Sequence, residues 1–253
     1  MPTEVWNPDQ YERFRRERQQ PFFDLLALVR PASSPRAIDL GCGTGELTCE
    51  LHRRLGARET IGVDSSAAML ERAAAHGGDG LRFERGDIAD FAAADGFDVI
   101  FSNAALHWLP DHEALIGRLT RALRPGGQLA VQVPANHDHA SHVTAAEVAS
   151  EMGIQPHTPQ VLLPESYAAI LGRAGYAEQH VRLQVYLHRL DSRAAVVEWV
   201  KGTLLTDYAR RLSEDGYADF LARYRARLLP KLADARPYLF TFKRIHFWAQ
   251  RPS

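Results

Sequence analysis

The sequence has little cysteine, almost no net charge and no long hydrophobic run. Its two cysteines, Cys42 and Cys49, are too few for a disulfide framework and lack the paired spacing of a zinc site. The formal net charge of -1 gives no field that would attract nucleic acid or a membrane surface. No apolar run approaches the roughly 20 residues that span a bilayer, and the first residues, MPTEVWNPDQ, lack a secretion signal. We therefore expect a cytoplasmic protein that binds neither nucleic acid nor membrane.

What the sequence does contain is 45% hydrophobic residues among 253, enough for one well-packed domain. Between Ala37 and Pro134, short apolar runs alternate with segments whose apolar residues recur at helical spacing. This alternation predicts an α/β fold with a doubly wound, mostly parallel sheet of seven strands. The expected strands are 36–39, 59–63, 81–86, 97–103, 127–133, 178–190 and 238–250. The expected helices are 45–56, 66–77, 111–124, 143–152, 165–174 and a helical stretch over 192–229. The segment RPGGQ is expected to close the third helix and turn the chain into the fifth strand.

The expected organisation has four parts. Residues 1–30 form an N-terminal helical arm that serves as a lid, and residues 31–190 form the core that binds the ligand. Residues 191–235 form a helical cap over the substrate site, since they lie between two expected strands. Residues 236–253 return to the core sheet as its final strand.

A glycine-rich loop, DLGCGTGE, follows the first expected strand, where doubly wound sheets bind their ligands. Its glycine spacing differs from the G-x-G-x-x-G of dinucleotide sites, and Asp39 would repel a phosphate. Two more acids, Asp64 and Asp87, end the next two strands, where they can accept hydrogen bonds from ribose hydroxyls and an adenine amino group. Three acids at one edge of the sheet predict a cationic nucleoside as the ligand.

The chain resembles S-adenosylmethionine-dependent methyltransferases through DLGCGTG, IGVDSSAAML, GDI and LRPGG, in that order between Ala37 and Val133. The resemblance implies S-adenosyl-L-methionine as cofactor and S-adenosyl-L-homocysteine as product. It implies that Gly41 and Gly43 approach the methionine moiety, Asp64 binds ribose, and Asp87 with the Ile88 amide reads adenine. The full expected cofactor set is Asp39, Gly41, Cys42, Gly43, Asp64, Ser65, Met69, Asp87, Ile88 and Asn103.

Further stretches are similar to the trans-aconitate 2-methyltransferase family over nearly the whole chain: WNPDQY, ERQQP, SNAALHWLPDH, LAVQVPAN, EWV and FKRIHFWA. Such enzymes esterify one carboxylate of a small tricarboxylic acid. A carboxylic acid with a pKa near ~4 is already ionised at neutral pH, so this transfer requires no general base. The protein must instead align the carboxylate with the methyl group and hold the remaining carboxylates.

Candidate residues for these tasks stand at the expected ligand edge, in the arm and in the cap. The catalytic candidates are Tyr11, Asn103 and His107. Tyr11 either closes over the cofactor or packs the arm, and Trp108 either lines the pocket or belongs to the core. The substrate-binding candidates are Tyr11, His107, Trp108, Asn136, His142, Lys201 and Arg244. Lys201 and Arg244 would clamp remote carboxylates, or else they are a solvated lysine and a structural arginine. No metal is expected, since the spacing of His137, His139 and His142 matches no common zinc motif.

One departure concerns the substrate. After EWV the family pattern has an arginine and a tryptophan, where this chain has Thr206, Asp207 and Tyr208. An acid in place of a cation suggests a substrate with fewer charges. The alternatives are O-, N- or C-methylation of another small molecule with His107 as base, and a nucleoside- or dinucleotide-binding protein. We expect a small-molecule substrate, and we expect the protein to be a monomer or a weak homodimer.

Overall fold

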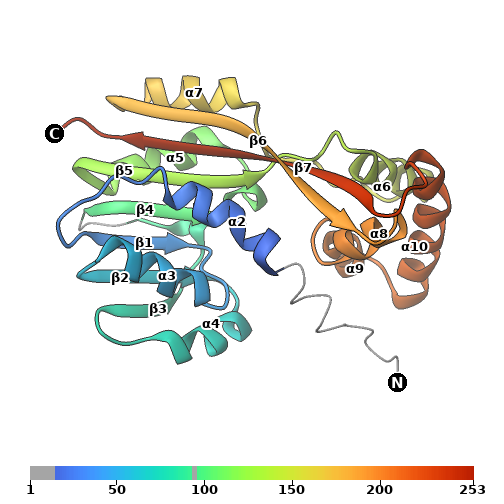
Figure 1. Cartoon of the computed structure of the whole chain (residues 1–253), viewed down its shortest axis with the longest axis horizontal. Coiled ribbons are helices and arrows are strands. Elements are labelled where there is room, and N and C mark those ends of the chain that lie inside the picture. The colour runs from blue at the N-terminus through green and yellow to red at the C-terminus, as the bar shows by residue number, and fades with distance from the viewer. Residues whose placement is uncertain (1–14, 93–95) are drawn as a thin grey trace. The chain divides into compact units, whose positions relative to one another are not determined.

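The structure, a computed structural model, describes residues 15–92 and 96–253, with side chains from residue 19 onward. The described residues form one sheet with strand order β3-β2-β1-β4-β5-β7-β6 (Figure 1). The strands are β1 (Arg36–Leu40), β2 (Glu59–Asp64), β3 (Leu81–Arg85), β4 (Phe97–Asn103), β5 (Leu123–Pro134), β6 (Glu178–Leu190) and β7 (Tyr238–Gln250). The α-helices are α2 (Arg15–Leu26), α3 (Glu46–Leu55), α4 (Ala67–Ala73), α5 (His112–Arg121), α6 (Ala140–Glu151), α7 (Pro164–Arg173), α8 (Ala194–Lys201), α9 (Leu205–Arg211) and α10 (Glu214–Leu228). The 3-10 helices are η1 (Ala74–His76), η2 (Ile88–Asp90), η3 (Leu106–Trp108) and η4 (Leu229–Lys231).

The sheet is parallel over its first five strands. β1 pairs in parallel with β2 and with β4, β2 pairs with β3, and β4 pairs with β5. Figure 1 shows β7 running opposite to β5 and β6. Because the order reverses direction at β1 and β4, the carboxyl ends of these two strands form the switch point at which such sheets bind ligands. The predicted doubly wound, mostly parallel seven-stranded sheet is confirmed.

One apolar cluster anchors the elements that carry the glycine loop. Phe22 of α2 and Leu51 of α3 pack with Phe101 of β4, and all three side chains are buried. The rings of Phe22 and Phe101 meet edge to face with centroids 5.0 Å apart, a geometry that aromatic pairs favour. Trp248 of β7 joins the same cluster and donates to the Gln128 side chain at 2.8 Å. Burial of these large side chains fixes α3, the helix that follows the glycine loop, against the sheet.

The RPGGQ segment is not the turn that the sequence suggests. α5 ends earlier, at Arg121, and the segment belongs to β5. The register shifts between the pairs Phe97↔Leu123 and Val99↔Gln128, so the prolyl-glycyl residues form an irregularity inside the strand. Gly126 accommodates it with a φ of +73°, and its N–H donates to the Pro252 carbonyl at 2.8 Å. Turn-forming residues are therefore used here for a bulge.

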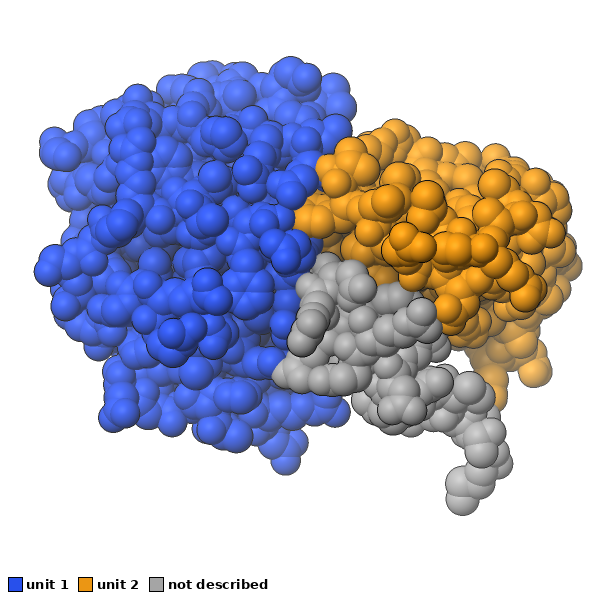
Figure 2. All heavy atoms as spheres, viewed as in Figure 1, with its two compact units in different colours: residues 1–133, 160–184, 245–253 blue, residues 134–159, 185–244 orange. Residues whose placement is uncertain are grey.

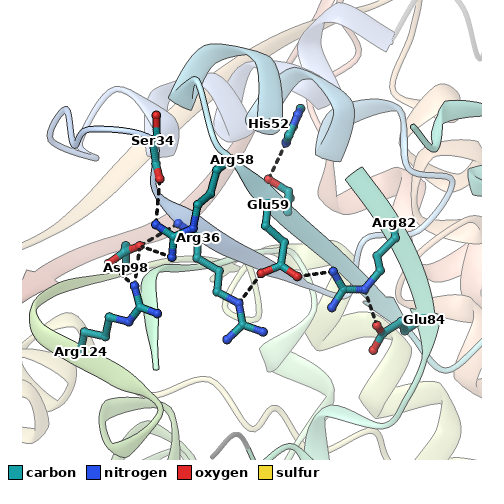
Figure 3. Close-up of polar contacts among 10 residues, drawn as sticks. Ser34, Arg36, His52, Arg58, Glu59, Arg82, Glu84, Asp98 and Arg124 are labelled. Carbon is teal, nitrogen blue, oxygen red and sulfur yellow. Dashed lines mark hydrogen bonds and ion pairs between the residues drawn. The ribbon is translucent and has the colours of Figure 1, made fainter. Parts of the chain in front are cut away.

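Charged side chains gather near the amino ends of the strands, away from the switch point. Figure 3 shows Glu59 accepting hydrogen bonds from both Arg36 and Arg82. Asp98 accepts from the Arg36 backbone N–H at 2.7 Å and lies 3.4 Å from Arg124 (Figure 3). The two arginines lower the pKa of Glu59, chiefly through the hydrogen bond from Arg82. These pairs compensate the charges at this end of the sheet.

The chain folds into two compact units, coloured separately in Figure 2. Unit 1 comprises residues 1–133, 160–184 and 245–253, and unit 2 comprises residues 134–159 and 185–244. The residues of β6 and β7 are thus divided between the units. The expected roles of residues 1–30 as a lid and 191–235 as a cap stay predictions. None of the described helices is long and apolar enough to cross a membrane.

Candidate active site

The glycine loop connects β1 to α3. At two of its three glycines, the space that a Cβ would occupy is filled by the protein's own side chains. A Cβ at Gly41 would stand 2.2 Å from the Cβ of Ala105, and one at Gly45 would stand 2.7 Å from Phe83. Both glycines also have positive φ, +83° and +77°, which favours glycine. Gly43, with φ +57°, has no described atom within 4 Å of its would-be Cβ. Of the three, Gly43 therefore leaves the space that the close approach of a ligand requires.

Four backbone N–H groups of this loop are already engaged. The N–H groups of Gly41 and Cys42 donate to the Val63 carbonyl at 2.8 and 3.0 Å. The N–H of Gly43 donates to the Asp64 carboxylate at 2.9 Å, and that of Gly45 to the Cys42 carbonyl at 3.1 Å. A phosphate-binding loop needs such N–H groups directed at the ligand. This loop is therefore poorly suited to a pyrophosphate.

Asp39, expected to face the ligand, points into the protein. Its carboxylate is 4% exposed and accepts a 2.6 Å hydrogen bond from the Thr48 hydroxyl of α3. Burial raises the pKa of Asp39 to about 7, the Thr48 hydrogen bond opposes this, and the nearby Asp64 carboxylate adds to it. Residues alternate between the two faces of a strand, and this position of β1 faces α3. Its burial favours a structural role over direct contact with the cofactor.

Asp64 ends β2 and ties the glycine loop to the next helix. One carboxylate oxygen accepts from Gly43 N–H, and the other accepts from Ser66 N–H, each at 2.9 Å. A carboxylate offers about four acceptor positions, so Asp64 can still accept hydrogen bonds from a ligand. Of the neighbouring candidates, Ser65 is exposed and Met69 is 41% exposed in the first turn of α4.

Asp87 follows β3 and begins the short helix η2. Its carboxylate accepts from the Ala89 N–H at 2.8 Å, and the side chain is exposed. The Ile88 side chain lies 3.7 Å from the would-be Cβ of Gly41. The loops after β1 and β3 therefore meet, as the expected adenine site requires. Cys42 beside them is buried, and burial raises the pKa of its thiol to about 12, so it is no thiolate nucleophile.

The segment after β4 completes this edge. Asn103 ends the strand, and its buried side-chain oxygen has no hydrogen-bond partner among the described residues. Ala104 adopts a φ of +55°, which is uncommon for a residue other than glycine and directs Ala105 against Gly41. His107 and Trp108 follow in η3, with ring centroids 4.6 Å apart and Trp108 49% exposed. Because its indole is exposed, Trp108 does not belong to the core, and its place in the pocket stays a prediction.

Sequence reasoning did not find His112, which supports this segment from beneath. Its imidazole lies 3.0 Å from the Leu106 carbonyl and 2.6 Å from the Tyr167 hydroxyl, and it is 4% exposed. Burial lowers the pKa of His112, which favours the neutral ring. In the sequence, a histidine in the first turn of an amphipathic helix looks like an ordinary surface residue. No sequence pattern distinguishes it, because its partners are 6 and 55 residues away.

The remaining substrate candidates belong to unit 2, apart from Tyr11, which lies outside the described residues. The buried Asn136 accepts from the Lys243 backbone N–H at 3.0 Å, which binds it to β7. Lys201 is paired with Glu198 at 3.0 Å. The guanidinium of Arg244 lies 4.9 Å from the centroid of the Phe242 ring. The ionic partner of Lys201 would compete with a carboxylate substrate.

His142 lines a cavity of unit 2 with His137 and His157. Burial, followed by the neighbouring histidines, lowers the pKa of His142 to about 3. Among residues 15–92 and 96–253, no group of three or more histidine, cysteine or acidic side chains is arranged to hold a metal ion.

Comparison with known proteins identifies the family. Residues 32–171 match the model of a methyltransferase domain family. The trans-aconitate 2-methyltransferase of Deinococcus radiodurans is 44% identical over 258 residues, which cover 98% of this chain and 99% of that protein. The chain belongs to the methyltransferase family. The enzyme of the same name from Variovorax paradoxus is 39% identical, over 97% of this methyltransferase and 98% of its own length.

A solved structure agrees with this assignment at the level of the fold. The YcgJ protein from Bacillus subtilis superposes with a TM-score of 0.63 at 17% identity, covering 93% of this methyltransferase and 99% of its own chain. The prediction of a methyltransferase, made from the glycine loop and the ordered motifs, is confirmed. The roles assigned to individual site residues stay predictions.

Proposed function

We propose that the protein transfers the methyl group of S-adenosyl-L-methionine to one carboxylate of a small acid such as trans-aconitate. Near full-length similarity to two enzymes named for that acid is the observation that carries the proposal. S-adenosyl-L-methionine is the methyl donor of this enzyme class, and its sulfonium supplies an electrophilic methyl group. S-adenosyl-L-homocysteine is then the second product.

The polar groups at the switch point fit an unphosphorylated, cationic nucleoside. Four of the loop N–H groups already donate to Val63, Asp64 and Cys42, so the loop has fewer N–H groups left to bind a phosphate. The acidic edge, in contrast, suits an ammonium, a sulfonium and ribose hydroxyls. Asp64 would bind the ribose with Ser65 beside it, and Gly43 provides the open approach.

The adenine and methionine parts would lie to either side of this centre. Asp87 and the Ile88 amide would hold the adenine, with Met69 against its ring. Asn103, whose buried oxygen lacks a partner among the described residues, is suited to accept a hydrogen bond from the ligand's ammonium group. Asp39, Gly41 and Cys42 shape the loop from within.

The chain's own residues would act by positioning. A carboxylate substrate arrives ionised, so no side chain has to remove a proton. Holding its oxygen in line with the methyl group at about 3 Å can supply roughly 7 to 11 kcal/mol of the barrier. Tyr11, Asn103, His107 and Trp108 would border the reacting carboxylate. Asn136, Lys201 and Arg244 would hold the rest of the acid, Arg244 by two parallel hydrogen bonds. The role expected for His142 stays a prediction, since this side chain lines a cavity of unit 2.

Transfer of radiolabelled methyl groups to trans-aconitate, citrate, simple monocarboxylic acids and phenols tests the proposal directly. The expected result is labelled monomethyl ester, with a rate that stays flat from pH 8 down to the pKa of the substrate carboxylate. Labelling of phenols alone, with a rate that falls below pH ~6.5, would instead assign His107 as a general base and overturn carboxyl methylation.

We propose also that the enzyme acts on a free small molecule in the cytoplasm, as a monomer or a weak homodimer. Light scattering after size-exclusion chromatography at several protein concentrations tests the second point.

A further inference from the structure

Unit 2 contains a cavity of about 420 Å³ that the methyl-transfer site does not account for. The residues that line it come from α6, from the segments before and after this helix, and from α9 with the residue that precedes it. It is lined by His137, His142, Val143, Ala146, Glu147, Ser150, His157, Pro159, Leu204 and Tyr208. All ten residues belong to unit 2, so the cavity is a property of that unit alone. Small-molecule pockets have volumes of about 300–1,000 Å³, and this cavity lies within that range.

The walls of the cavity are largely hydrocarbon. Val143 and Ala146 come from α6, and Pro159 and Leu204 face the same space. Ser150, which also lines the cavity, satisfies its hydroxyl on its own helix by donating to the Ala146 carbonyl at 3.0 Å. Such a surface gains free energy by burying apolar atoms of a ligand, at about 25 cal/mol per Å².

The imidazole of His142 is one of the polar groups of the cavity, and its lowered pKa leaves it uncharged at neutral pH. Its Nδ1 lies 3.1 Å from the Ser141 hydroxyl oxygen, which in turn lies 2.9 Å from Nδ1 of His139. Burial lowers the pKa of both His139 and His142. Nε2 of His142 can form one hydrogen bond with a ligand, as donor or acceptor according to its tautomer.

Tyr208 offers a second hydrogen bond. Its hydroxyl oxygen accepts from the His157 backbone N–H at 3.0 Å, so the hydroxyl proton can be donated to another acceptor. Its ring stacks on Phe220 with centroids 4.7 Å apart, and the residue is 1% exposed. Packing thus fixes the position of this hydroxyl before any ligand arrives.

The charges around the cavity are compensated by one another. Glu147 is paired with Lys231 at 2.6 Å. Asp207 is paired with Arg211 at 2.8 Å and lies 3.4 Å from His157. Among the residues that the structure describes, no lysine or arginine lines the cavity. An anionic group would lose its hydration here without gaining a counter-charge from the walls, which is strongly unfavourable.

We propose that this cavity is a binding site for an uncharged, mainly apolar small molecule about the size of a substituted benzene ring, with one polar group that reaches His142 and Tyr208. Two of the three residues that depart from the trans-aconitate pattern take part, since Tyr208 lines the cavity and Asp207 holds His157. The site is independent of which acid is methylated.

Benzyl alcohol and benzoate are suitable probes, because they share a ring and differ mainly in charge. Ligand-observed NMR and calorimetry on the full chain should detect benzyl alcohol, with benzoate at least tenfold weaker. Ala146→Phe fills the cavity and should abolish the binding, whereas Ala222→Phe, at an exposed position of α10, should leave it unchanged. His142→Gln should weaken it about three- to tenfold, as expected for one neutral hydrogen bond.

Leu204→Trp fills the same cavity from another element and serves if Ala146→Phe does not fold, which circular dichroism and thermal unfolding would reveal. Three results would overturn the proposal: no binding of benzyl alcohol at 20 mM, equal or tighter binding of benzoate, or full binding by a folded variant with the cavity filled. If the filled variants lose benzyl alcohol binding but still transfer methyl groups to acids, the cavity is a site separate from the methylation site.

Discussion

Replacement of Asp39 by asparagine should change the stability of the protein in a pH-dependent way, with the variant gaining relative to wild type as the pH rises. Asp39 is buried, and its folded-state pKa is raised from 3.8 to about 7. An acid whose pKa is higher in the folded state binds its proton more tightly there. The free energy of unfolding therefore falls as the pH rises from the unfolded pKa to the folded one, and it levels off above that.

The size of the effect follows from these two pKa values. At pH 5 the folded carboxyl is almost fully protonated, while that of the unfolded chain is mostly ionised. Between pH 5 and pH 8 the folded protein must ionise a buried group, which costs about 2 to 3 kcal/mol at about 1.36 kcal/mol per pKa unit. The asparagine side chain of the variant cannot ionise. It can still accept the Thr48 hydrogen bond, while its buried amide adds a cost that does not change with pH.

Urea unfolding of the cofactor-free wild type and Asp39→Asn at pH 5 and pH 8 measures this difference. The stability of the variant relative to wild type should be about 2 to 3 kcal/mol more favourable at pH 8 than at pH 5. Thr48→Val is the matched control, because it removes the hydrogen bond that holds the pKa down. It should extend the pH-dependent loss of stability above pH 7. A relative stability that is the same at both pH values would show that Asp39 is ionised in the folded protein, and the argument from burial would fail.

The other predictions separate stability from binding. Gly41→Ala should destabilise by more than about 3 kcal/mol in urea unfolding, because its Cβ would stand 2.2 Å from another Cβ, whereas Gly43→Ala should cost about 1 kcal/mol yet weaken S-adenosylmethionine binding by calorimetry. Asp64→Ala should weaken the same binding by about 2 to 3 kcal/mol, and unchanged affinity would remove it from the ribose site. Glu59→Gln should cost about 1 kcal/mol at pH 7, a loss that shrinks as the pH falls from 4.5 towards the lowered folded-state pKa of Glu59, below which the wild-type carboxylate is also protonated. Arg244→Lys should raise the KM for a polycarboxylate and leave cofactor affinity unchanged, while identical kinetics would place Arg244 outside the pocket.

The sheet could be predicted from the sequence because its strands carry apolar residues in recognisable patterns, as short runs in β1, β2 and β4 and in alternation over parts of β6 and β7. β6 and β7 have the bounds that the patterns EQHVRLQVYLHRL and YLFTFKRIHFWAQ indicate. The RPGG bulge could not be predicted, since glycine and proline suit a turn and a bulge equally. The two units could not be predicted either, because each collects segments that lie far apart in the sequence.

For the three acids, the sequence predicts at which strand ends they stand but not the direction in which each one faces. Asp39, Asp64 and Asp87 do lie at successive strand ends. Asp39 nevertheless occupies the inward face of β1 under Thr48, whereas Asp87 is exposed. Ala104 shows the same limit, since its positive φ depends on the loop that it must close against Gly41.

The glycine loop distinguishes a methyl donor from a dinucleotide by the direction of its N–H groups. Both kinds of loop need glycine for positive φ and close packing, so glycine number alone cannot separate them. In this loop the N–H groups of Gly41 and Cys42 return to Val63, and that of Gly43 is taken by Asp64. A phosphate would have to displace a carboxylate to reach Gly43, against the repulsion of that same carboxylate. A cation and a pair of ribose hydroxyls face no such conflict, because they bind the carboxylate oxygens and leave its bond to the loop intact.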